Sequence, residues 1–241
     1  MASGPVYGRA RRRRLVRART TGALAAVAVV SLVVVTAHAS LSSERHVGMV
    51  LGSPVPWPSF GQELRLGVEL VLTGYERLLL LVGLLVTCRR LRSIFAFITS
   101  FTVAHSVTSA LAALNVFTLS ARVVDPLVSA TIVFVGVENL LRGDEPRGRV
   151  ILTFVFGLIH GFVCGSALRE LGVGVAGMPA LGPLLGFDLG VGLGQVAVAG
   201  VLLPGFWVAL RSPLIARHGP PLVSMFVAAA GAYLLLQRLA F

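Results

Sequence analysis

Ionisable side chains interrupt stretches of this sequence that are otherwise apolar. His105 and His160 each fall near the middle of an apolar run, Glu76 lies in a third run, and Asp188 lies in a glycine-rich one. Imidazole with carboxylate is a ligand set suited to first-row divalent metals such as nickel, cobalt or zinc, and the same groups can also relay protons. His105, His160, Glu76 and Asp188 are therefore the predicted metal ligands.

Further polar residues in these runs are expected to support such a site, namely Asp125, Glu138, Asn139, Gln195 and Arg77. An ionisable group at bilayer depth is costly, so it normally faces the interior of a helix bundle and has a partner or a function. The structural alternative is that these groups only neutralise one another or bind backbone carbonyls. Two mid-run histidines together with several acids favour function. Cys164, one turn beyond His160, is interpreted as a packing residue, with soft-metal coordination as the alternative.

The amino-acid composition indicates the environment in which these residues lie. The chain is 56% hydrophobic and 13% charged, whereas an average soluble domain is about 25% charged. The net charge is +11 and every basic residue is arginine. Such a charge often indicates nucleic-acid binding, but the chain lacks the polar body of a nucleic-acid binder. Two cysteines are too few for a disulfide framework. The predicted partner is the lipid bilayer, and the oligomeric state stays open.

The apolar runs predict an all-α fold, a polytopic membrane helix bundle, because a spanning helix needs roughly 20 mostly apolar residues. The predicted spans are residues 22–37, 66–87, 94–115, 123–141, 150–168, 183–209 and 221–237. The first follows an arginine run and ends in Ala-His-Ala, so it is either a cleaved signal peptide or an anchor helix. Residues 1–39 are thus the N-terminal segment, 40–65 an extracytoplasmic linker and 66–241 a six-helix membrane domain.

The arginines also predict the orientation, since cytoplasmic loops carry the excess of basic residues. Most of them fall in the N-terminal segment and in the loops around residues 89–92, 142–149 and 211–217. These parts are predicted to be cytoplasmic, and residues 40–65 and the C-terminus extracytoplasmic. Arg77 is the exception, because it lies within a predicted span.

Glycines recur every fourth residue in two of the predicted spans. One run is Gly157, Gly161 and Gly165, and the other is Gly182, Gly186, Gly190 and Gly194. Small residues at this spacing allow helix backbones to approach closely. Both runs therefore predict helix contacts, and such an approach could bring Asp188 to His160.

Several of these elements, taken in order, resemble the HupE/UreJ family over roughly residues 66–210. The segments are Gly-Tyr-Glu-Arg-Leu-Leu at 74–79, Phe-Thr-Val-Ala-His-Ser at 101–106, Val-Glu-Asn at 137–139, Phe-Gly-Leu-Ile-His-Gly at 156–161, and Gly-Phe-Asp-Leu-Gly-Val at 186–191 with Gly-Gln at 194–195. The resemblance implies six membrane helices after an N-terminal signal, in the bacterial inner membrane. It also implies a permease linked to hydrogenase and urease maturation, with Ni²⁺ or Co²⁺ as transported ion and no permanently bound cofactor. The family's members are not enzymes, and metalloenzyme-maturation proteins are the implied partners.

The resemblance assigns metal handling to His105 and His160, and the chain departs from the family elsewhere. The family's first helix reads His, five residues, Asp, His, and these places hold Leu70, Glu76 and Arg77. Asp188 and Gly192 replace the family's Asn and Glu. One hypothesis is a permease whose site is remodelled around the four predicted ligands. The alternative is a non-transporting scaffold or accessory protein with a degenerate metal site, closed by Arg77 on Glu76 or Asp188.

Overall fold

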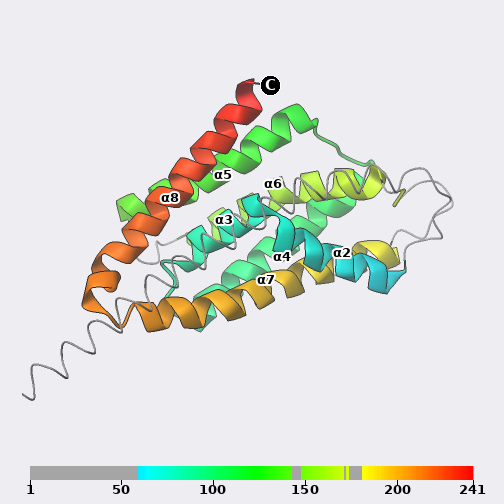
Figure 1. Ribbon diagram of the computed structural model, residues 1–241. Coiled ribbons are helices and arrows are strands. Elements are labelled where there is room, and N and C mark those ends of the chain that lie inside the picture. The colour runs from blue at the N-terminus through cyan, green and yellow to red at the C-terminus, as the bar shows by residue number, and fades with distance from the viewer. Residues whose placement is uncertain (1–58, 143–147, 171, 174–180, 241) are drawn as a thin grey trace, which may run out of the picture.

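The computed structural model describes residues 59–142, 148–170, 172–173 and 181–240, and the regular structure in these ranges is helical, without strands (Figure 1). The helices are α2 (Phe60–Thr73), α3 (Tyr75–Leu85), α4 (Leu91–Ala113), α5 (Ala121–Arg142), α6 (Arg149–Glu170), α7 (Leu181–Ala209) and α8 (Pro213–Ala240). The predicted all-α class is confirmed. The signal peptide or anchor helix at 22–37 lies outside the described residues, as does most of the linker.

The outer surface of the bundle is apolar. Helices α4 to α8 are each long and apolar enough to cross a membrane. Large apolar side chains on them stay exposed, for example Ile151 at 70% and Val201 at 74%. An apolar surface of this extent requires a hydrocarbon solvent or a partner, so the chain is a multi-pass membrane protein.

The expected single helix over 66–87 is wrong, because the chain forms two helices there. Helix α2 starts earlier, at Phe60, where Ser59 and Gln62 form a capping box. The last residues of the predicted linker are therefore helical. The break falls at Gly74, whose ψ of 96° is extended. A Cβ at Gly74 would lie 2.6 Å from the Leu70 carbonyl oxygen, so a larger residue would force the turn to shift. Such interruptions are tolerated at membrane depth where the backbone is buried in protein.

Helix α8 also begins before its predicted start at residue 221. The helix begins at Pro213 and runs through Pro220 and Pro221, although proline lacks the backbone donor that a helix interior uses. Proline at a first helical position is favourable, because the missing donor would be unpaired there in any case.

The helices pack in three close pairs, α4 with α6, α2 with α7 and α5 with α8. Figure 1 shows α2 with α7 along one side of the bundle and α5 with α8 along the other. Helix α3 lies between them and contacts α5, α7 and α8. Every residue of α3 from Leu78 to Leu85 is buried, which makes α3 the centre of the hydrophobic core.

Glycines line the contact of α4 with α6, as their spacing predicted. Gly157, Gly161 and Gly165 face the carbonyl oxygens of Phe101, His105 and Ser109 in that order. A Cβ at Gly157 would lie 2.5 Å from the Phe101 oxygen, and one at Gly161 would overlap the His105 oxygen. The two backbones are therefore in direct contact. In the second run, Gly186, Gly190 and Gly194 face α2 in the same way, whereas Gly182 has open space.

Gly161→Ala is expected to lower thermal stability, because the added methyl group pushes α6 away from α4; overpacking of this kind costs about 1–3 kcal/mol. The measurement is the melting temperature of the detergent-solubilised protein. Gly200→Ala is the matched control, since a Cβ at Gly200 of α7 meets nothing within 4 Å. Equal melting temperatures for the two variants would contradict direct backbone contact at Gly161.

Candidate functional site

A buried His–Asp pair joins α4 to α7 at the centre of the candidate site. His105 Nδ1 lies 3.3 Å from Asp188 Oδ1, and the His105 side chain is only 1% exposed. Phe101 and Phe187 stack against the imidazole, with ring centroids 6.0 and 6.4 Å away. Neither His105 nitrogen makes a hydrogen bond of good geometry within the described residues, and neither does Asp188 Oδ1. Buried polar atoms are nearly always satisfied, so these atoms have capacity for a further ligand.

His160 on α6 lies beside this pair. Its Nε2 is 3.1 Å from Thr131 Oγ1 of α5, and its side chain is buried. Phe101 contacts both histidine rings, with its centroid 5.5 Å from that of His160. Asp188 pairs with His105 and not with His160, the histidine suggested by the sequence, and the glycines of its helix face α2 instead.

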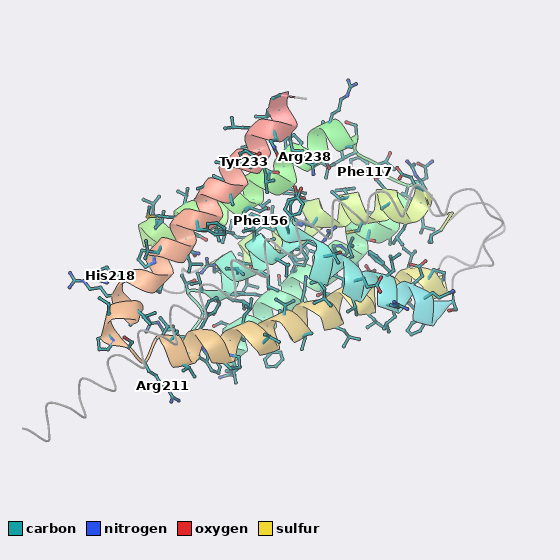
Figure 2. The ribbon with its side chains drawn as sticks, in the orientation of Figure 1. Phe117, Phe156, Arg211, His218, Tyr233 and Arg238 are labelled. Atoms are coloured by element: carbon teal, nitrogen blue, oxygen red, sulfur yellow. The ribbon has the colours of Figure 1, made fainter. Side chains whose placement is uncertain are left out.

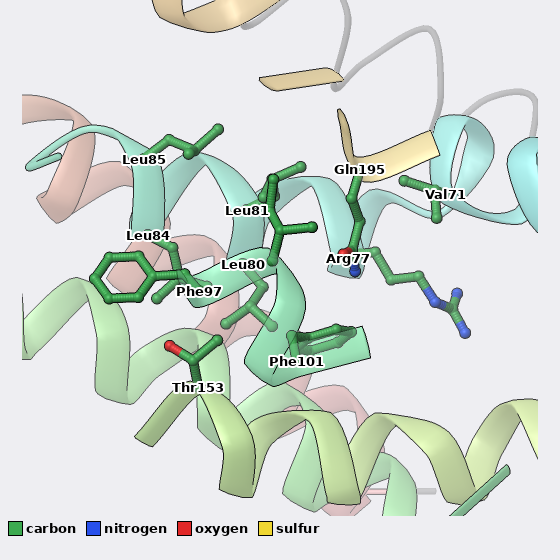
Figure 3. Close-up of a pocket in the computed structure, with 11 residues that line it drawn as sticks. Val71, Arg77, Leu80, Leu81, Leu84, Leu85, Phe97, Phe101, Thr153 and Gln195 are labelled. Atoms are coloured by element: carbon green, nitrogen blue, oxygen red, sulfur yellow. The ribbon is translucent and has the colours of Figure 1, made fainter. Parts of the chain in front are cut away.

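Gln195 lies two turns after Asp188 on α7 and extends the polar surface toward α4. Thr102 Oγ1 donates to Gln195 Oε1 over 3.3 Å. Gln195 also lines a small pocket together with Arg77, Phe101 and several leucines of α3 (Figure 3). The pocket is mostly apolar and has room for little more than one water molecule.

Arg77 approaches the site from α3, and it meets a thiol rather than a carboxylate. In Figure 3 its guanidinium points away from the pocket leucines. Arg77 Nη2 donates to Cys164 Sγ over 2.9 Å. The same thiol is 1% exposed and faces the His105 imidazole. The predicted pairing of Arg77 with Glu76 or Asp188 is not the contact observed.

Glu76 lies in a separate cluster at one end of the bundle. Arg238 of α8 bridges it to Asp125 of α5, with contacts of 3.3 Å to Glu76 Oε1 and 2.7 Å to Asp125 Oδ2. Figure 2 shows Arg238 at one end of α8 and Arg211 and His218 at the other. Because the helix is broken at Gly74, Glu76 does not continue a face of α2 as it would in one continuous helix.

A second buried polar cluster contains Glu138 and Asn139, and it includes a residue that the sequence did not single out. Arg149, assigned from the sequence to a cytoplasmic loop, starts α6 with 2% of its side chain exposed. It donates to Asn139 Oδ1 and to Thr87 Oγ1, and its Nε lies 3.9 Å from Glu138 Oε2. Asn139 Nδ2 in turn donates to the Gly83 carbonyl over 2.7 Å. The cluster therefore ties α3, α5 and α6 together.

The four predicted ligands are not gathered at one point. His105 and Asp188 are in contact, His160 is adjacent, and Glu76 lies with Arg238 and Asp125. In the part of the chain that the structure describes, no three His, Cys, Asp or Glu side chains are grouped so that they could hold a metal ion. Cys164, interpreted from the sequence as packing, is the additional side chain at the His105 pair. Its only sequence signal was its place one turn beyond His160.

The fold and these side chains define a class, a polytopic membrane protein with a buried imidazole–carboxylate centre. The family model described as HupE / UreJ protein matches residues 46–238. The chain belongs to the HupE/UreJ family. No curated protein and no solved structure is detectably similar to it.

Arg149→Met is expected to lower the stability by about 3–5 kcal/mol, because removing one partner of a buried ion pair leaves the other charge uncompensated. The free energy of unfolding is measured by denaturation in mixed micelles. Adding Glu138→Gln should restore part of the loss. Arg92→Gln, at an exposed position on α4, is the control and should have little effect. A wild-type stability for Arg149→Met would show that the cluster does not hold the three helices together.

Proposed function

We propose that this protein is a membrane permease, or an accessory protein of one, that handles a transition metal ion through the His105 region. The observation that carries the proposal is the buried His105–Asp188 pair with its unsatisfied polar atoms. Such groups are costly inside a membrane and are generally functional. Family membership supports the proposal, because nickel and cobalt uptake and accessory functions are associated with HupE/UreJ proteins.

The proposed path leads from the Arg238 end to the centre of the bundle. Glu76 and Asp125 lie at that end, Arg77 and Cys164 lie deeper, and His105, His160 and Asp188 follow. By the positive-inside rule this end is extracytoplasmic, since Arg211 and Arg217 lie at the start of α8 and the N-terminal arginines precede the first span. The path therefore starts outside the inner membrane and passes between α3, α4 and α7.

A non-transporting scaffold or accessory protein is the second candidate, and one observation favours it. Arg77 brings a permanent positive charge to the site, and like charges repel. A chain that has kept the fold and lost transport would retain the helix packing, and substitution of its histidines would leave cellular metal unchanged.

Replacing both histidines, as His105→Ala with His160→Ala, is expected to abolish the metal accumulation that depends on this protein. The reason is that both imidazoles on the proposed path are lost. Cell-associated nickel, cobalt and copper are measured by mass spectrometry in cells expressing equal membrane levels of each variant. His218→Ala is the matched control, because His218 is exposed and remote from the site. Equal accumulation of every metal by wild type and the double variant would contradict transport and favour the scaffold.

Arg238→Gln is expected to open the outer end of the path, because Glu76 and Asp125 then lose their shared counter-charge and repel each other. Labelling of Cys164 by a membrane-impermeant thiol reagent, added outside spheroplasts in a Cys88→Ser background, should become several-fold faster. Arg217→Gln, at the other end of α8, should leave the rate unchanged. Unchanged labelling in Arg238→Gln would remove Arg238 from the path.

A further inference from the structure

Cys164 occupies a position that a packing role does not explain. Its sulfur is buried, accepts a hydrogen bond from Arg77 at 2.9 Å and faces His105. A simple core cysteine lies among apolar groups and is inert, whereas this sulfur contacts a guanidinium and an imidazole. The thiolate is the form that binds metals.

His105 supplies a second ligand at the same place. Its Nδ1 faces Asp188 at 3.3 Å, which is how a carboxylate orients a metal-binding imidazole and increases its basicity. Its Nε2 is buried and makes no hydrogen bond of good geometry within the described residues, and the neighbouring thiol is that of Cys164. Phe101 and Phe187 hold the ring by stacking. The imidazole is thus oriented from one side, and its second nitrogen stays available.

We propose that Cys164 and His105 form a two-ligand site for a monovalent thiophilic cation, Cu(I) or its analogue Ag(I). The inference rests on the proposed function, which it deepens by naming the class of ion that the His105 region takes. Binding releases the thiol proton of Cys164 to the solvent and forms one sulfur and one nitrogen bond to the metal.

The ligand set decides between monovalent and divalent ions. Thiolate ligands favour Cu(I), whereas zinc sites generally provide four ligands. In the described ranges no third His, Cys, Asp or Glu is placed to hold the same ion, since Asp188 contacts the other side of the His105 ring. Two ligands satisfy a d¹⁰ monovalent ion in linear geometry, and they leave Ni(II), Co(II) or Zn(II) poorly coordinated.

Arg77 also favours a monovalent over a divalent ion. Coulomb repulsion is proportional to the charge of the ion, so the guanidinium disfavours a divalent cation about twice as strongly as a monovalent one. Its hydrogen bond to the sulfur is compatible with metal binding, because a thiolate has several lone pairs. Arg77 is therefore a specificity residue of this site, where the family's histidine would instead be a ligand.

The test is Cu(I) binding by the purified full-length protein in lipid nanodiscs, without oxygen, by competition with a chromophoric chelator. The wild type is expected to bind one Cu(I) and to show a near-ultraviolet thiolate-to-copper absorption. Cys164→Ser should weaken binding by more than about 100-fold, since loss of a supporting residue alone costs 10–100-fold. Cys164→Ala is the second variant, and size-exclusion profiles confirm that both are folded.

Cys88→Ser is the matched control, because Cys88 is equally buried, lies just beyond the end of α3 opposite to Arg77, and donates to the Leu84 carbonyl. It should bind Cu(I) as the wild type does. Arg77→Gln should raise the affinity for Ni(II) relative to Cu(I), measured as the ratio of the two dissociation constants.

Two results would overturn the inference. One is Cu(I) affinity and absorption that survive both Cys164 variants. The other is Ni(II) or Co(II) binding that is tighter than Cu(I) binding and depends on His105 but not on Cys164; the proposed function would then stand and only the ion class would be wrong. Absence of any metal binding by the wild type would contradict the proposed function itself.

Discussion

The direct contact of the α4 and α6 backbones is the constraint on which the candidate site depends. Gly161 lies against the His105 carbonyl, and Gly157 and Gly165 lie against α4 one turn on either side. With side chains at these positions, the helices would separate by the thickness of a methyl group or more. His160 and Cys164 would then move away from His105. The glycines on α7 likewise allow α2 to pack closely against it. Asp188 lies on another face of α7 and contacts His105 of α4.

The arginines inside the bundle show three ways of accommodating a charge that cannot lose its proton. Arg149 is enclosed by the Thr87 hydroxyl, just after α3, and by the Asn139 amide and Glu138 carboxylate of α5. Arg238 stays partly exposed and bridges two carboxylates. Arg77 has a sulfur as its closest partner. The first two arrangements resemble ordinary compensation of buried charge, whereas the third leaves a polarised thiol next to a histidine. This difference is why we propose Cys164 as a metal ligand.

Much of the architecture was predictable because it depends on local properties. Apolar length located α4 to α7 within a few residues, and the four-residue glycine spacing correctly indicated close helix contacts. The break at Gly74 was not predictable, because isolated glycines are common in membrane helices and only the packing around this one decides its conformation. The burial of Arg149 was missed for a related reason. A charged residue next to a loop is expected to be exposed to solvent, whereas the oxygen partners of Arg149 come from α5 and from the turn after α3.

The sequence by itself determined the class, the helices and the residue types available for chemistry, since hydrophobic length and side-chain spacing act within one helix. Only the tertiary structure decided which of those residues meet. It paired Asp188 with His105, moved Glu76 to Arg238 and Asp125, and brought Arg77 to Cys164. These contacts join residues up to 162 positions apart. Their geometry follows from helix packing and from the change of direction at Gly74, and neither is encoded in the spacing along a single helix.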